Sequence, residues 1–273
     1  MKKFTTFLSR AYMAIILLFL YAPIAVLVVF SFNSSNSRAV WSGFSTEWYV
    51  KLFHDSAVIN AFYTTILVSI IAAILATIIG TVAAIGFNNL SNKWRSPLMT
   101  INNIPMTNAD IVTGVSLCLL FVAAGSIFGI RLGFGTLLIA HITFNIPYVV
   151  LSVMPKLRQL DRNLVDAALD LGCTWFQAFW KAIVPEIKSG IVNGMLIAFT
   201  MSIDDFIISY FTAGSSVQTL AMTIYSMTRR RVTPEINALS TILFATVLTL
   251  LLIVNIRSSV QEKKLQQMQK KSI

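Results

Sequence analysis

Long stretches almost free of charged side chains constrain this sequence more than any other feature. They recur six times along 273 residues, and each is close to the roughly 20 residues that an α-helix needs to cross about 30 Å of hydrocarbon. We expect membrane helices over residues 11–31, 60–87, 106–128, 135–154, 190–210 and 236–256. The sequence thus predicts an all-α integral membrane protein, with one transmembrane domain over residues 1–273 and spans two to six at 60–256.

The composition excludes a soluble domain. Hydrophobic residues make up 56% of the chain and charged residues only 12%, whereas soluble domains carry about 25% charged residues. The two cysteines, Cys118 and Cys173, lie far apart, which argues against a disulfide framework and a thiolate metal site.

The sequence leaves two span boundaries ambiguous, one in the first span and one in the third. Residues 1–10 followed by the apolar run 11–31 resemble a signal peptide, but the run is longer than a signal-peptide core, so we expect a retained span. Residues 97–130 are too long for one straight helix, and we expect a break at Asn102-Asn103-Ile104-Pro105.

Basic residues predict the orientation. Fifteen of the 21 Lys and Arg residues lie in the two terminal segments and in the loops at 88–105 and 155–189. Because these segments share one side of a six-span protein, the positive-inside rule places both termini, including the tail 257–273, in the cytoplasm. Arg229, Arg230 and Arg231 fall in an outer loop, against this trend. The net charge of +10 is then a signal of topology and of contact with anionic lipid, and no nucleic-acid partner is expected.

The loop at 156–188, between the fourth and fifth spans, predicts two short helices. Asp161 and Asn163 are available as N-cap residues, and Gly172 permits a sharp change of direction. Aromatic residues recur at helical spacing over 175–183, and Pro185 is expected to stop or bend the second helix. Such a loop either lies in a groove of another protein or rests on lipid.

Three carboxylates lie inside the apolar spans. Asp110 follows the expected break, and Asp204 and Asp205 interrupt the fifth span, while no span contains Lys or Arg. A charge at mid-bilayer costs about 2.5–3.5 kcal/mol, so these carboxylates either face a path for a cation or serve the structure as a helix cap and a buried pair. Aromatic faces for a cation are offered by Tyr210 and by Trp48 in the outer segment 32–59.

Enzymatic chemistry is not expected. No Gly-Lys dipeptide is present, so the chain has no phosphate-binding Walker loop and is not itself an ATPase. His141, alone in the fourth span, is typical of an interhelical hydrogen bond rather than of a metal ligand. We therefore predict no cofactor and no metal in this chain.

The loop carries a resemblance to a known family. Asp166-Ala167-Ala168, then Gly172 and Pro185, resemble the EAA loop of ABC-importer permeases, with Asp166 in place of Glu. In that family the loop is a coupling helix that docks on a cytoplasmic ATPase, and the resemblance implies this role for all five residues.

Further segments resemble the spermidine/putrescine permeases, in particular the PotC-like subunit. Among them are 105–112, Ser202-Ile203-Asp204-Asp205, 224–227 and 234–239. The resemblance implies a permease that moves polyamines into the cytoplasm by alternating access, together with an ATPase dimer, a second permease and an extracytoplasmic binding protein. It favours a place on the substrate path for Asp110, Asp204 and Asp205. We predict a path formed by these three residues together with Ser202, Tyr210 and Trp48. Two alternatives stay open: an ABC permease for another substrate such as ferric ion or thiamine, and a stand-alone secondary transporter.

Overall fold

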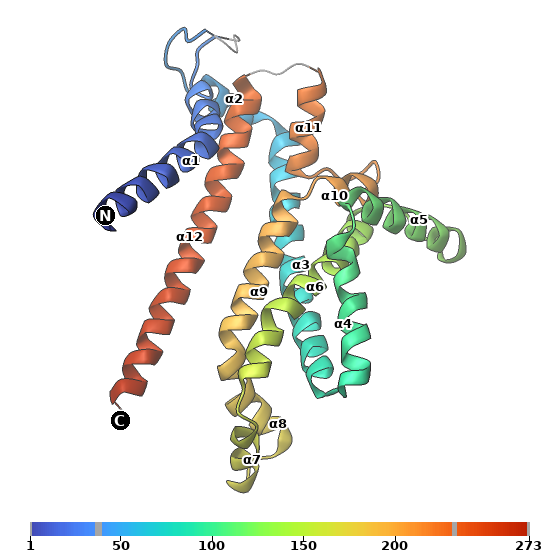
Figure 1. Ribbon diagram of the computed structural model, residues 1–273. Coiled ribbons are helices and arrows are strands. Elements are labelled where there is room, and N and C mark those ends of the chain that lie inside the picture. Colours follow the sequence, from blue (N-terminus) through green and yellow to red (C-terminus); the bar gives the residue numbers. More distant parts are fainter. Residues whose placement is uncertain (1, 36–39, 231–233, 272–273) are drawn as a thin grey trace. The chain divides into compact units, whose positions relative to one another are not determined.

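A computed structural model describes residues 2–35, 40–230 and 234–271 (Figure 1). The regular elements of these residues are all helices. Six helical stretches are long and apolar enough to span a membrane: Ser9–Phe30, Ser56–Asn89, Asp110–Phe128, Phe134–Gln159, Trp175–Asp204 and Pro234–Leu252. Helices suit a bilayer because they satisfy every backbone polar group within one segment. The predicted all-α fold with six spans is confirmed.

The chain divides into two compact units, which are described one at a time. The first unit, residues 1–60 and 223–246, contains α1 (Lys2–Phe30), α2 (Glu47–His54), the start of α3, and parts of α11 (Leu220–Arg230) and α12 (Pro234–Lys271). The second unit, residues 61–222 and 247–273, contains the other helices and most of α3 (Ser56–Asn89). A single domain over residues 1–273 stays a prediction.

In the first unit, the segment after α1 is tied together by Asn33, whose side chain is fully buried. Its amide accepts from Ser42 N–H at 2.9 Å and donates to the Val40 carbonyl at 2.9 Å. Phe32 stacks on both Phe44 and Tyr49. The apolar side chains of α1 are exposed along most of its length, as expected of a helix that faces lipid or another subunit.

In the second unit, α6 (Phe134–Gln159) and α9 (Val184–Asp204) run side by side (Figure 1). Glycine permits their close approach. A Cβ atom on Gly190 would lie 2.9 Å from the Ser152 carbonyl oxygen, and one on Gly194 would lie 3.2 Å from Val149 Cα. Gly80 of α3 meets Val149 in the same way, with a Cβ distance of 2.7 Å. Small residues therefore bring α3, α6 and α9 together, as is usual for helices in lipid.

The break in the third span lies later than predicted. A separate helix, α4 (Asn92–Thr107), runs through Pro105, and the span itself is α5 (Asp110–Phe128). The predicted break at 102–105 is wrong, because Pro105 removes only its own backbone hydrogen bond and α4 continues past it to Thr107. The chain leaves the helix at Asn108, whose N–H still bonds the Ile104 carbonyl.

The fifth span also differs from its prediction. It begins at Trp175 and ends at Asp204, and a short helix, α10 (Ile207–Thr212), follows the break. Pro185 does not stop the helix, which continues from α8 (Trp175–Ala178) through a π-helical turn, η1 (Phe179–Ile183), into α9. The wider π turn accommodates the proline in the first turn of α9, where a missing N–H costs least.

The loop between α6 and α9 begins with α7 (Arg162–Asp170), as predicted. Asp161 is its N-cap and accepts from Asn163 N–H at 3.0 Å. The helix ends at Gly172, whose φ of +82° lies in the left-handed region. Gly172 N–H bonds the Leu169 carbonyl and Cys173 N–H bonds the Ala168 carbonyl, which is a Schellman motif. Thr174 and Gln177 then form a capping box at the start of α8, which the sequence analysis did not predict.

The Schellman motif predicts a conformational test at Gly172. No atom lies within 4 Å of a Cβ placed there, so only the positive φ opposes a side chain. We expect Gly172→Val to cost about 1–2 kcal/mol and to raise tryptic cleavage in the loop by about fivefold or more. Gly172→Asn should cleave nearly as slowly as wild type, since Asn tolerates this conformation. Equal cleavage of the Val and Asn variants would contradict the assignment.

Candidate functional site

The break in the fifth span is held by Asp205. The carboxylate accepts from the backbone N–H groups of Ile208 at 3.2 Å and Ser209 at 2.7 Å, and so caps the first turn of α10. It also accepts from the Ser209 hydroxyl at 2.8 Å. A break inside a span leaves backbone groups without helical partners, and here a side chain satisfies two of them.

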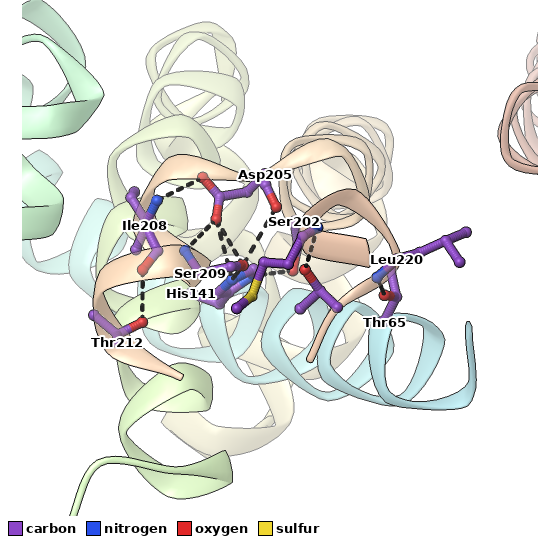
Figure 2. Close-up of polar contacts among 10 residues, drawn as sticks. Thr65, His141, Ser202, Asp205, Ile208, Ser209, Thr212 and Leu220 are labelled. Atoms are coloured by element: carbon purple, nitrogen blue, oxygen red, sulfur yellow. Dashed lines mark hydrogen bonds and ion pairs between the residues drawn. The ribbon is translucent and has the colours of Figure 1, made fainter. Parts of the chain in front are cut away.

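His141 of α6 joins the two sides of this break (Figure 2). Its Nδ1 lies 2.6 Å from the Ser202 hydroxyl on α9, and its Nε2 lies 3.0 Å from the Ser209 hydroxyl on α10. Nε2 is also 3.5 Å from the Asp205 carboxylate. All four side chains are buried or nearly so; only 8% of the Asp205 side chain is exposed. The role predicted for His141, an interhelical hydrogen bond, is confirmed.

The directions of these hydrogen bonds follow from the available donors. Ser209 has a single hydroxyl hydrogen, and when it is given to Asp205, the Nε2–H of His141 must donate to Ser209. In neutral imidazole Nδ1 then accepts from the Ser202 hydroxyl. The result is a continuous chain from Ser202 through His141 and Ser209 to Asp205. The network satisfies its own polar groups and needs no ligand to complete it.

Asp204, one residue earlier, has a different environment. It is the last residue of α9 and is exposed, and among the described residues its carboxylate has no hydrogen bond or ion pair. Tyr210 is also exposed, at 54%, and its ring lies 5.5 Å from those of both Phe206 and Phe211. The adjacent aspartates thus separate into one that holds the structure and one that is open to a ligand.

Asp110 lies at the second helix break. It is in the first turn of α5 and is exposed, while Ala109 occupies the N-cap position. The carboxylate therefore does not cap the helix, which was one of its predicted alternatives. One turn later, Gly114 packs against Phe211 and the backbone of Ile207 and Ile208. The break before α5 and the break before α10 thus belong to one packed pair of helices, α5 and α10.

Two predicted path residues are engaged elsewhere. Ser202 is 3% exposed and belongs to the His141 network. Trp48, in the first unit, donates through Nε1 to the Asn33 carbonyl at 2.8 Å, and Lys51 lies 5.7 Å from its ring centroid. A substrate role for these residues stays a prediction.

The loop at 156–188 exposes several large apolar side chains: Leu171, Trp175, Phe176 and Trp180. The predicted coupling residues lie beside them. Asp166, Ala167, Gly172 and Pro185 are exposed and Ala168 is half-buried. An apolar surface of this kind in a polar loop is typical of a contact with another protein or with lipid.

Known proteins match both the sequence and the fold. Residues 76–267 match the family described as "Binding-protein-dependent transport system inner membrane component". The chain belongs to this family. It is 39% identical over 232 residues to the putrescine transport system permease protein PotI of Escherichia coli strain K12, a match that covers 84% of this chain and 83% of PotI. It is 38% identical over 248 residues to the spermidine/putrescine transport system permease protein PotC of Haemophilus influenzae, covering 91% and 94%.

The fold has a solved relative in the crystal structure of a bacterial ABC transporter involved in the import of the acidic polysaccharide alginate. The TM-score is 0.73 at 16% identity, over 94% of this chain and 96% of that one. At this identity the likeness concerns the fold alone. The predicted fold class and the predicted permease family are confirmed.

As a member of this transport family, the chain is a membrane permease. Within the described ranges, no group of three or more His, Cys, Asp and Glu side chains is placed to hold a metal ion. That the chain needs no metal or cofactor stays a prediction. Ser209 was not predicted as a site residue. Its position four residues after Asp205, within a stretch predicted to be helical, could have indicated that the two side chains meet.

The network predicts that His141 stabilises the permease. His141→Leu keeps a similar volume but removes both hydrogen bonds, which leaves the Ser202 hydroxyl without its acceptor and the Ser209 hydroxyl without its donor, at a cost of about 1–3 kcal/mol. We expect the melting temperature of the purified protein in detergent to fall by several degrees. The control is His54→Leu, since His54 is exposed and contacts only the Val50 carbonyl of its own helix. Equal melting temperatures for the two variants would refute a stabilising role.

Proposed function

We propose that this permease is a subunit of an ATP-driven importer that carries polyamines such as spermidine and putrescine into the cytoplasm. The observation that carries the proposal is a pair of exposed carboxylates, Asp110 and Asp204, each at a helix break that ends an apolar span. A polyamine presents ammonium groups separated by methylenes, so it requires separated negative charges and apolar surface between them.

The helix ends strengthen the preference for a cation. The last carbonyl groups of a helix carry a partial negative charge. Asp204 stands at the end of α9, and Asp110 follows the end of α4 by three residues. In transporters with broken helices, carbonyls at such ends commonly coordinate cations. Tyr210, exposed and six residues after Asp204, offers an aromatic face for cation–π contact.

The relatives support the same substrate class. The names of PotI and PotC give putrescine and spermidine/putrescine as what those systems transport. The high coverage of these matches favours the same substrate class here over ferric ion or thiamine. A stand-alone secondary transporter is disfavoured by membership of a binding-protein-dependent family.

The partners follow from the same proposal. An ATPase dimer would dock on the exposed surface of α7 and α8, so that Asp166, Gly172 and the aromatic residues beside them transmit its closure to α9. A second permease would complete the path, and an extracytoplasmic protein would deliver the substrate. Both termini would then lie in the cytoplasm of a bacterial cell, with the membrane crossed six times.

If the exposed carboxylates bind a cationic substrate, then replacing Asp110 or Asp204 should affect uptake, whereas replacing Asp205 should affect stability. Asp204→Asn and Asp110→Asn remove a charge with almost no change in volume. A charge pair about 4 Å apart is worth about 1–4 kcal/mol, so the KM for polyamine uptake should rise about tenfold or more. Asp205→Asn should instead lower the melting temperature, because both Asp205 oxygens accept hydrogen bonds and Asn replaces one of these acceptors with a donor.

Uptake by the complete transporter, at matched membrane levels, measures these effects. Asp161→Asn is the control, because Asn caps a helix as well as Asp does. Wild-type KM in both the Asp204 and the Asp110 variant would remove the support for a cationic substrate.

The orientation predicts a labelling pattern. In a variant with Cys118 and Cys173 replaced by Ala, single cysteines at Ser42 and Gln159, both exposed, should label from opposite sides of the membrane, Ser42 from outside. An impermeant maleimide applied to whole cells and to inverted vesicles distinguishes the sides. Labelling of both from one side would contradict the six-span topology.

A further inference from the structure

The start of α4 and the end of α6 enclose a cavity that the proposed substrate path does not use. The two helices are in contact and run in opposite directions (Figure 1). The cavity between them has a volume of about 370 Å³. As far as the chain is described, no acidic side chain lines it, and its polar lining consists of Asn92, Arg95, Ser96, Thr100, Asn103 and Arg158. Two positive charges and several hydrogen-bond donors thus surround one space.

The two arginines of this cavity have no ion-pair partner within the described residues. Arg158 is exposed and forms neither a hydrogen bond nor an ion pair there. Arg95 is half-buried and donates to the Asn92 side chain, which orients its guanidinium group. Asp166 lines a neighbouring cavity of about 950 Å³ that the same two arginines share, yet it forms no ion pair with either of them. An anion between the arginines would be attracted by both.

A second cavity adjoins the first and is mainly apolar. Its volume is about 310 Å³, and it is lined by Met99 and Arg158, which it shares with the polar cavity, and by Leu151, Met154, Pro155 and Gln159. Leu151 lies about 10 Å from Arg158 along α6, toward the middle of the span Phe134–Gln159. The apolar cavity therefore extends from the arginines toward the hydrocarbon of the bilayer.

The arginines lie at the depth of lipid headgroups. Arg158 is in the last turn of its span, and Arg95 follows the end of the preceding span, at Asn89, by less than two turns. Trp94, beside Arg95, is 67% exposed, as is common for aromatic residues at the membrane interface. In the part of the chain that the structure describes, α4 buries none of its residues. A molecule outside this chain is therefore needed to cover α4.

We propose that these two cavities bind an anionic phospholipid, with its phosphate between Arg95 and Arg158 and an acyl chain beside Met99 and Leu151. Arginine matches the geometry of a phosphate with two parallel N–H···O bonds, and basic pockets between membrane helices bind lipid headgroups. A polyamine would be repelled by both arginines. A soluble anion would leave the apolar cavity unfilled. The site depends on the chain's place in a membrane and not on what the permease transports.

The test measures binding of phosphatidylglycerol to the complete transporter in detergent, by native mass spectrometry over a range of lipid concentrations. The tightest-bound phosphatidylglycerol should bind at least about tenfold more tightly than phosphatidylcholine, whose headgroup has no net charge. Arg95→Gln and Arg158→Gln should each raise the Kd for phosphatidylglycerol about tenfold, which corresponds to about 1.4 kcal/mol. Lys93→Gln is the matched control, since Lys93 is exposed on the same helix but does not line either cavity. Equal Kd values for all three variants would overturn the proposal, as would equal binding of the two lipids.

A second pair of variants distinguishes a lipid from a free anion. Leu151→Trp fills the apolar cavity, whereas Ile139→Trp adds the same ring at an exposed position in the first half of α6. Leu151→Trp should raise the Kd for phosphatidylglycerol about tenfold, and Ile139→Trp should leave it unchanged. Inorganic phosphate at the lipid's concentration should not displace the lipid. Equal Kd values for the two Trp variants, or displacement by phosphate, would overturn the assignment to a phospholipid.

An acidic segment of a partner protein would give a different result. Arg95→Gln and Arg158→Gln would then release a subunit from the complex in size-exclusion chromatography, while the Kd for phosphatidylglycerol stayed at its wild-type value. That outcome would overturn the proposal. The polyamine proposal is tested by uptake and fails separately, because neither the arginines nor the apolar cavity belong to the predicted substrate path.

Discussion

The absence of hydrogen-bonding solvent inside a bilayer is the constraint on which this structure depends. Helices meet it over most of the chain, and each departure from a helix has to be satisfied locally. At the break after α9, Asp205 bonds two backbone N–H groups, and His141 joins Ser202 before the break to Ser209 after it. The irregular backbone that exposes Asp204 is thus stabilised by buried polar contacts, and the position of the open carboxylate follows from them.

Close helix packing is the second consequence of the same constraint. Lipid gives little hydrophobic drive for helices to associate, so contact area has to come from close approach. Gly80 and Gly194 supply it at Val149, and Gly190 supplies it at Ser152 and Val153. A seam of small residues thus holds α6 and α9 close together, and the hydrogen bond between Ser202 and His141 lies on the same pair of helices.

The number of spans and the loop motif were predictable because they depend on local sequence. Apolar length gives the spans, and the left-handed Gly172 follows a helical pattern with a clear cap at Asp161. The exact breaks were not predictable from proline. Pro105 lies near a helix end, and Pro185 sits beyond a π-helical turn, so neither interrupts its helix where the sequence suggested. The His141 network joins residues more than 60 positions apart, and no local pattern encodes such a contact.

The fold by itself does not determine which substrate is transported. A transporter described as importing an acidic polysaccharide shares this architecture at 16% identity, so the scaffold accommodates polymers of negative charge elsewhere. In the proposed importer, selection between anion and cation would fall to the few side chains at the helix breaks. Here these are carboxylates, Asp110 and Asp204, beside helix ends whose carbonyls have the same sign. A negatively charged substrate would meet repulsion at both breaks, whereas a cation with spaced charges would be attracted at both.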